Sequence, residues 1–190
     1  MKKTILVDCD GVVLNWEYAF DIFMEEHGFT KVEGAGTIYN IGERYGIDKD
    51  QGRKLIKIFN ESASIGFLPP LRDAVEVVTK MAAEGWTFIA VTSLSTNKFA
   101  QKLRRRNLDK LFGKGTFETV TCLATGANKD KALAKYKDSG MYWVEDKPEN
   151  ALAGQKQGLK PILVEHGFNM DNKDFPLAKN WKEIYEIVQG

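Results

Sequence analysis

The chain has 190 residues, of which 43% are hydrophobic and 28% charged, and its formal net charge is +1. This composition is typical of a globular protein and excludes an intrinsically disordered chain. The near-neutral charge predicts neither a nucleic acid polymer nor an anionic membrane as partner, and no apolar run approaches the roughly 20 residues of a membrane-spanning helix. The two cysteines, Cys9 and Cys122, belong to no metal-binding pattern, so we expect a cytoplasmic protein without a disulfide framework.

The first strand is predicted at residues 3–7, where an apolar, β-prone run leads directly into Asp8, Asp10 and Gly11. In open α/β sheets, ligands bind beyond the carboxyl ends of the strands. The two carboxylates are therefore expected at a binding site, with Gly11 allowing the chain to turn. The alternative is that the two acids and the glycine only form a polar turn.

Residues 15–69 carry helical signals and no strand pattern. Asn15 is a suitable N-cap for a helix that ends at Gly28, a short helix from Thr37 is stopped at Gly46, and a third lies between Asp50 and Ala63. This block is longer than a crossover connection needs. We therefore predict a helical cap over 15–69, inserted after the first strand of a core formed by 1–14 and 70–190.

Strands and helices alternate after the Pro69-Pro70 pair. Strands are predicted at 86–91, 117–123, 141–144 and 161–164, and helices at 73–85, 96–112, 128–140, 148–158 and 181–188. Asp73 and Asn128 are the expected caps of the first and third of these helices. The alternation predicts an α/β fold with a doubly wound parallel sheet.

Three of the predicted strands end in residues suited to bind a metal ion or a phosphate group. These residues are Asp8 with Asp10, Thr92 with Ser93, and Glu145 with Asp146. Carboxylates from two strand ends provide the hard oxygen ligands that Mg²⁺ prefers. A hydroxyl and a lysine, either Lys129 or Lys131, are suited to hold phosphate oxygens. The pattern predicts a Mg²⁺ and phosphate site at one edge of the sheet.

These motifs resemble those of the haloacid dehalogenase superfamily of phosphatases. Residues 8–12 match its first motif, 88–92 its second, Lys129 or Lys131 its third, and 144–146 its fourth, in the expected order. The resemblance spans essentially the whole chain. It implies a Mg²⁺-dependent phosphomonoesterase with a Rossmann-like core and a cap.

The resemblance also implies a role for each site residue. Asp8 would attack phosphorus and become an aspartyl phosphate, and Asp10 would act as acid and then base. Asp8, Asp146 and the backbone carbonyl of Asp10 would hold Mg²⁺, with Glu145 bound directly or through water. Thr92, with Ser93 beside it, and one lysine would bind the phosphoryl oxygens. Lys129 is favoured over Lys131, because family members place this lysine three residues before an Ala-Leu pair.

Residues 10–17 and 68–76 resemble the 5'(3')-deoxyribonucleotidase branch, in which an aromatic residue at the position of Trp16 stacks on the base. The alternative is that Trp16 only packs the cap onto the core. A nucleoside monophosphate is therefore the first substrate class, and a phosphosugar or another small phosphorylated metabolite is the alternative. Outside hydrolases, a phosphate-accepting receiver domain also uses such residues, but it carries the phosphorylated aspartate on a later strand and lacks a helical insertion. A silent phosphatase-like module is a further alternative, although such a module usually lacks one of the acids and none is missing here. The sequence leaves the oligomeric state open.

Other conspicuous residues are not assigned to the site. Residues 104–106 are three consecutive arginines and are expected on a solvated helix face. Cys9 is expected to pack in the core, and His27 and His166 receive no role. The aromatic residues Tyr39, Tyr45 and Phe59 are each expected in the cap's own core sooner than in the substrate pocket.

Overall fold

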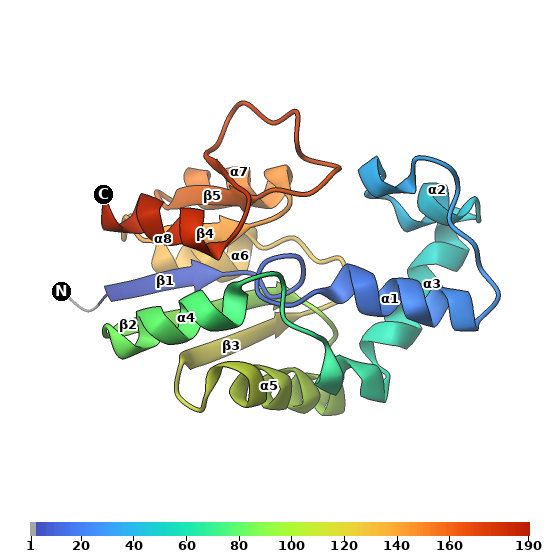
Figure 1. The fold of residues 1–190 in the computed structure, drawn as a ribbon, viewed down its shortest axis with the longest axis horizontal. Helices are drawn as coiled ribbons and strands as arrows, with labels where there is room; N and C mark the ends of the chain where they lie inside the picture. Colours follow the sequence, from blue (N-terminus) through green and yellow to red (C-terminus); the bar gives the residue numbers. More distant parts are fainter. Residues whose placement is uncertain (1–2) are drawn as a thin grey trace.

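The computed structural model describes residues 3–190 as a six-stranded sheet covered by helices (Figure 1). The strand order is β3-β2-β1-β4-β5-β6, and every pairing is parallel. The strands are β1 (Lys3–Val7), β2 (Trp86–Ser93), β3 (Phe117–Leu123), β4 (Tyr142–Glu145), β5 (Lys160–Val164) and β6 (Leu177–Ala178). The predicted α/β fold with a doubly wound parallel sheet is confirmed. The two-residue strand β6 was not predicted, because it is too short to give a pattern.

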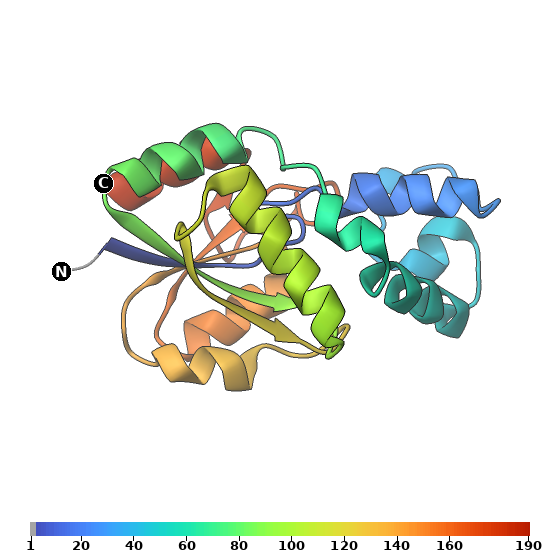
Figure 2. The ribbon, with the colours of Figure 1, turned by 90° about the horizontal axis from the view of Figure 1, so that it is seen from below.

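The central strand β1 is buried on both faces of the sheet. Ile5 and Val7 belong to one hydrophobic cluster, whereas Leu6 belongs to a second one, as the alternation of side chains along a strand requires. Helices α4, α5 and α8 supply residues to the first cluster, and α6 and α7 supply residues to the second. Figure 2 shows the sheet lying between these two layers.

The helical segments follow the predicted order. They are α1 (Trp16–Glu26), η1 (Ala35–Thr37), α2 (Ile41–Tyr45), α3 (Lys49–Asn60), η2 (Ala63–Phe67), α4 (Ala74–Ala83), α5 (Lys98–Phe112), α6 (Asp130–Leu133), η3 (Ala134–Tyr136), α7 (Pro148–Lys156) and α8 (Trp181–Gln189). Asn15 caps α1 as expected, since its side chain accepts a hydrogen bond from the backbone N–H of Tyr18. No helix in the described part of the chain is both long and apolar enough to cross a membrane.

Two predicted helix caps differ from the structure. Asp73 occupies the N-cap position of α4 as predicted, but its side chain makes no cap hydrogen bond there; its carboxylate instead accepts hydrogen bonds from the backbone N–H groups of Trp181 and Lys182, at 2.9 and 3.1 Å, at the start of α8. Asn128 does not cap α6, whose first flanking residue is Lys129. The first case depends on a contact between segments far apart in sequence, and the second on a one-residue shift of a helix boundary. Local sequence patterns resolve neither.

Helices α1, α2 and α3 lie beyond the carboxyl ends of the strands (Figures 1 and 2). The chain enters and leaves this region through two adjacent segments, where Leu14 pairs with Pro70 in an isolated bridge. The backbone N–H of Asn15 also donates to Pro69 O at 2.8 Å, and that of Leu71 to Val13 O at 2.9 Å. We call residues 13–15 and 69–71 the connecting ribbon, and the helical region that it carries the cap.

Candidate active site

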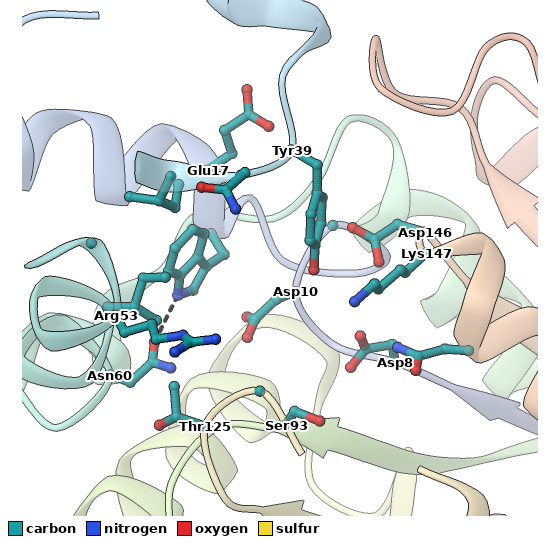
Figure 3. Close-up of a pocket in the computed structure, with 18 of the residues that line it drawn as sticks. Asp8, Asp10, Glu17, Tyr39, Arg53, Asn60, Ser93, Thr125, Asp146 and Lys147 are labelled. Carbon is teal, nitrogen blue, oxygen red and sulfur yellow. Dashed lines mark hydrogen bonds between the residues drawn. The ribbon is translucent and has the colours of Figure 1, made fainter. Parts of the chain in front are cut away.

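A cavity of about 590 Å³ lies between the carboxyl ends of the strands and the cap. Its lining on the sheet side includes Asp8, Asp10, Ser93, Lys129, Asp146 and Lys147. On the cap side it includes Trp16, Tyr39, Lys49, Arg53, Lys57 and Asn60. Figure 3 shows side chains from both sides converging on this space. A cavity of this size accommodates a small metabolite.

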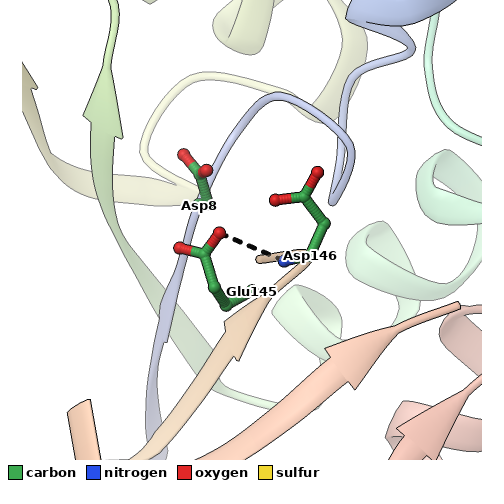
Figure 4. Close-up of side chains that lie close together, drawn as sticks. All are labelled: Asp8, Glu145 and Asp146. Atoms are coloured by element: carbon green, nitrogen blue, oxygen red, sulfur yellow. Dashed lines mark hydrogen bonds between the residues drawn. The ribbon is translucent and has the colours of Figure 1, made fainter. Parts of the chain in front are cut away.

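Three carboxylates meet at the sheet edge (Figure 4): those of Asp8 and Glu145 are buried, and that of Asp146 is half-buried. One carboxylate oxygen of Asp8, one of Glu145 and one of Asp146 lie within 4.8 Å of one another. Lys129 Nζ lies 2.6 Å from Asp8 Oδ2 and 2.7 Å from Glu145 Oε2, and its side chain is 1% exposed. Lys131, by contrast, is exposed. The structure therefore brings Lys129, and not Lys131, to the carboxylates.

Glu145 lies behind the cavity and not in its lining. Its side chain is fully buried, and Oε2 accepts a hydrogen bond from Lys129. Its other oxygen, Oε1, accepts from the backbone N–H groups of Asp146 and Lys147, at 3.1 and 3.2 Å. Glu145 thus holds both the lysine and the turn that presents Asp146.

The electrostatics of this cluster favour a bound cation. Burial raises the pKa of Asp8 to about 7, although Lys129 opposes this shift. Burial and the neighbouring Glu145 also raise the pKa of Asp146 well above its ordinary value. Burial works against ionisation of Glu145, but Lys129 and the hydrogen bond from Asp146 bring its pKa below the usual range. Since Lys129 offsets one of three negative charges, the donor set fits a divalent cation with oxygen ligands.

The turn after Asp10 requires a glycine. Gly11 has a φ of 74°, in the left-handed region, and a Cβ at this position would collide with the carboxylate of Asp146. The carbonyl oxygen of Gly11 accepts a hydrogen bond from His166 Nε2 at 2.7 Å. Gly11 therefore lets the loop after β1 come close to the loop after β4.

Arg104 contradicts the prediction of a solvated arginine face. Its side chain is fully buried, and its Nη2 lies 2.8 Å from Asp10 Oδ1 and donates to Oδ2 at 3.1 Å. Its Nη1 donates to Thr92 Oγ1 at 3.3 Å. The sequence held a signal for this placement, because Arg104 lies four residues from both Ala100 and Leu108, on the apolar face of α5.

The two hydroxyl residues at the end of β2 differ in placement. Thr92 is fully buried, accepts from Arg104, and does not belong to the cavity lining. Ser93 lines the cavity, and its hydroxyl donates to Ala127 O at 2.8 Å. The hydroxyl that reaches the cavity is therefore that of Ser93.

Trp16 lines the cavity and also packs the cap. Its ring stacks on Phe20, with centroids 4.5 Å apart and an interplanar angle of 12°. Its Nε1 donates to Asn60 Oδ1 at 2.8 Å, and Asn60 in turn donates from Nδ2 to Leu94 O at 3.1 Å. A residue of the cap thus links the indole to the loop after β2.

Tyr39 lines the cavity, whereas the sequence favoured a place for it in the cap's own core. Its ring contacts Phe168 with centroids 4.9 Å apart, and Lys147 Nζ lies 5.1 Å from the ring centroid. Figure 3 shows its hydroxyl directed at the space between Asp8 and Asp10. Although Tyr39 is 52% exposed overall, desolvation of its hydroxyl and the nearby carboxylates raise its pKa, so the hydroxyl stays protonated and can donate a hydrogen bond. Tyr45 and Phe59, by contrast, are buried as expected.

His166 also lines the cavity, although the sequence assigned it no role. It stacks on Phe168, with centroids 5.3 Å apart and an interplanar angle of 5°. Its position just after β5, at the carboxyl end of a parallel strand, could have indicated that His166 lies near the site. His27 lies elsewhere and contacts Phe23 O. Burial raises the pKa of the Cys9 thiol to about 12, which suits the packing role expected for it.

No model of a known protein family matches the sequence. An uncharacterised 32.4 kDa protein of Enterobacteria phage T4 is 33% identical over 144 residues. That match covers 73% of this chain and 51% of the phage protein, so the chain spans about half the length of this relative.

Solved structures with a similar fold include several phosphatases. A haloacid dehalogenase-like hydrolase from Streptococcus pneumoniae has a TM-score of 0.67 at 13% identity, over 98% of both chains. A "predicted phosphatase" from Clostridium acetobutylicum has a TM-score of 0.67 at 13% identity, over 100% of this chain and 99% of its own. The D,D-heptose 1,7-bisphosphate phosphatase of B. bronchiseptica, solved with magnesium and phosphate, has a TM-score of 0.58 at 10% identity, over 98% of both chains. The chain therefore has the haloacid dehalogenase-like fold.

Proposed function

We propose that this protein is a Mg²⁺-dependent phosphomonoesterase that acts through an aspartyl phosphate on Asp8. The observation that carries the proposal is the contact between Asp8 and Lys129 on the sheet side of the cavity, beside Asp10 and Asp146. A carboxylate is a recognised nucleophile in phosphoryl transfer. The similarity in fold to solved phosphatases supports this choice of reaction.

Asp8, Asp146 and the backbone carbonyl of Asp10 would hold Mg²⁺, and Glu145 would support them from behind. The bound ion would offset the repulsion between the Asp8 carboxylate and an anionic phosphate group. Lys129 and the hydroxyl of Ser93 would bind the phosphoryl oxygens, the serine by turning its proton from Ala127 O towards the phosphate. Lys129 is well placed for this, because contact with two carboxylates raises its pKa despite burial and keeps it charged.

Asp10 would supply and remove the protons of the two half-reactions. In the first, which starts with Asp10 protonated, an oxygen of Asp8 bonds to phosphorus, the ester P–O bond breaks, and the leaving oxygen takes the proton of Asp10. In the second, water attacks phosphorus, its proton passes to Asp10, and the bond from phosphorus to Asp8 breaks. Asp10 returns to its starting state, and Asp8 is free for another cycle.

A nucleoside monophosphate is the substrate class that the cavity supports best. The rings of Trp16 and Tyr39 both line it, and aromatic rings provide stacking surfaces for a planar base. A phosphosugar is the second candidate, because Asn60, Thr125 and Asn150 offer polar groups in the same lining. The sugar would leave the stacking surface of Trp16 unused.

A panel of nucleoside monophosphates and sugar monophosphates tests this proposal through Mg²⁺-dependent release of phosphate. We expect nucleotides to be hydrolysed with the highest kcat/KM, and Asp8→Asn to reduce their turnover by at least about 1,000-fold, since it removes the nucleophile. Circular dichroism of the variant would establish that it is folded. Unchanged turnover in Asp8→Asn would refute the mechanism, and activity restricted to sugar phosphates would refute the nucleotide assignment.

A further inference from the structure

One face of α3 forms a wall of the cavity. The residues of α3 in the lining are Lys49, Gly52, Arg53, Ile56, Lys57 and Asn60. Their spacing of three and four residues places them on a single side of the helix. Gly52 fixes this orientation, because a Cβ there would approach Gly42 N to 3.2 Å, so that α3 packs closely against α2. The face that looks into the cavity is thus determined by packing within the cap.

Three of these residues are cations, and we call Lys49, Arg53 and Lys57 the α3 basic stripe. The side chains of Lys49 and Lys57 have no ion-pair or hydrogen-bond partner within residues 3–190. Arg53 has an ion pair with Asp50 at 3.3 Å, but both side chains are largely exposed, at 66% and 76%. Such a pair contributes little and does not hold Arg53 in place.

The α3 basic stripe is separate from the groups proposed to bind the reacting phosphate. Figure 3 shows Arg53 reaching into the cavity beside Asn60, on the side away from Asp8 and Lys147. From Lys49 to Lys57 the stripe extends about 12 Å along the helix. The reacting phosphate would be held at the sheet edge, so these cations would face the part of the substrate that leaves.

A neutral leaving group would give the stripe nothing to bind. Covering a cation without providing a partner costs free energy, whereas an anionic group would form charge-assisted hydrogen bonds with it. Lys54, on another side of the same helix, is exposed like the three cations of the stripe but is absent from the lining. The stripe therefore differs from an ordinary solvated helix face because its residues line the cavity.

We propose that the α3 basic stripe binds a second phosphate group of the substrate, so that the preferred substrates are small phosphomonoesters carrying two phosphates. This inference rests on the proposed phosphatase function and adds to it a substrate class. The shared chemistry is the second phosphate, which either a nucleoside bisphosphate or a sugar bisphosphate supplies.

The test compares matched substrate pairs that differ by one phosphate. A nucleoside 5'-monophosphate is compared with its 3',5'-bisphosphate, and a hexose 6-phosphate with its 1,6-bisphosphate, by kcat/KM. We expect the bisphosphate to be preferred at least about tenfold in one of the pairs, which shows the source of the second phosphate, and the preference to fall at high salt. A ratio of about two or less in both pairs would overturn the proposal, because two cleavable groups alone give that factor.

Variants of α3 connect the preference to the stripe. In the double variant Arg53→Gln/Lys57→Gln we expect the ratio to fall to about two, mainly through KM of the bisphosphate, while Lys54→Gln keeps the wild-type ratio. A wild-type ratio in the double variant would also overturn the proposal. If no substrate releases phosphate, the phosphatase function itself fails; if monophosphates react but the ratio is about two, only this inference fails.

Discussion

The guanidinium of Arg104 and the carboxylate of Asp10 form an ion pair of 2.8 Å, although 94 residues separate them in the chain. The Arg104 side chain is fully buried and that of Asp10 is 20% exposed. Arg104 also donates to Thr92, so it connects the loop after β1 to the end of β2. We regard Arg104 as a positioning residue that fixes the orientation of Asp10.

Replacing Arg104 by Met is expected to reduce both stability and turnover. The loss of one partner leaves the Asp10 carboxylate poorly compensated, which costs about 3 kcal/mol in buried pairs. We expect kcat to fall about 100-fold with little change in KM, because Asp10 would lose its orientation. Denaturant unfolding and steady-state kinetics measure the two effects.

Two further variants serve as controls for this prediction. Arg106→Met changes an exposed arginine on the same helix and should alter stability by less than about 0.5 kcal/mol. Arg104→Lys keeps the charge and should recover part of kcat. An Arg104→Met enzyme with normal kcat would rule out the positioning role.

Binding of Mg²⁺ is expected to strengthen as the pH rises towards 7. Burial raises the pKa of Asp8 to about 7, so at lower pH a proton must leave before the carboxylate can bind the ion. Displacement of this proton makes the apparent Kd fall about tenfold for each pH unit below about 7, and a proton displaced from Asp146, whose pKa is also raised, would extend the fall. Isothermal titration calorimetry measures this dependence, and equal affinity at about pH 5.5 and 8 would contradict it.

His166 is expected to make the stability depend on pH. Burial lowers its pKa below the ordinary value of 6.5, so the unfolded chain takes up a proton at a higher pH than the folded one. Its contribution is therefore fully present above about pH 6.5 and decreases as the pH falls below it, by at most about 1.4 kcal/mol per unit. The difference in unfolding free energy between wild type and His166→Phe isolates this effect, and a difference that does not change between about pH 8 and 5 would exclude it.

The hydroxyl of Tyr39 is expected to contribute to substrate binding and not to stability. Tyr39→Phe keeps the ring against Phe168 but removes the donor that faces the carboxylates. A hydrogen bond to a charged phosphate is worth about 1.5 to 3 kcal/mol, so we expect kcat/KM to fall about 10- to 100-fold with the melting temperature unchanged. Tyr18→Phe, at a 57% exposed position outside the cavity, is the matched control. Equal kcat/KM in both variants would remove Tyr39 from the site.

The sequence predicted the sheet because its strands are continuous apolar runs that end in polar residues. For the same reason it predicted that Asp8 and Asp146 would meet, since parallel strands deliver their carboxyl ends to one edge. It left Lys129 and Lys131 as alternatives for the lysine, and only the family resemblance favoured Lys129. The roles of these residues and the limits of the cap remain predictions.

The sequence did not predict the positions of side chains that depend on contacts between segments far apart in the chain. Tyr39 reaches the cavity because the cap packs near Phe168, and nothing in its neighbourhood indicates this. The carboxylate of Asp73 accepts a hydrogen bond at the start of a helix that begins more than 100 residues later. The charge of Arg104 and its two arginine neighbours led to the prediction of an exposed side chain, although its spacing from the apolar residues of α5 places it on the buried face of that helix. Local patterns thus define elements, whereas contacts distant in sequence define much of the site.

The connecting ribbon limits how the cap can move. Because its two segments are hydrogen bonded to each other on both sides of the Leu14–Pro70 bridge, they act as one attachment and not as two independent tethers. A rotation of the cap would therefore pivot near this line. Trp16, two residues from Leu14, would stay almost in place, whereas Tyr39 would travel farther and break its contact with Phe168. Such a rotation would widen the cavity on the side of Tyr39 and leave the side of Trp16 almost unchanged.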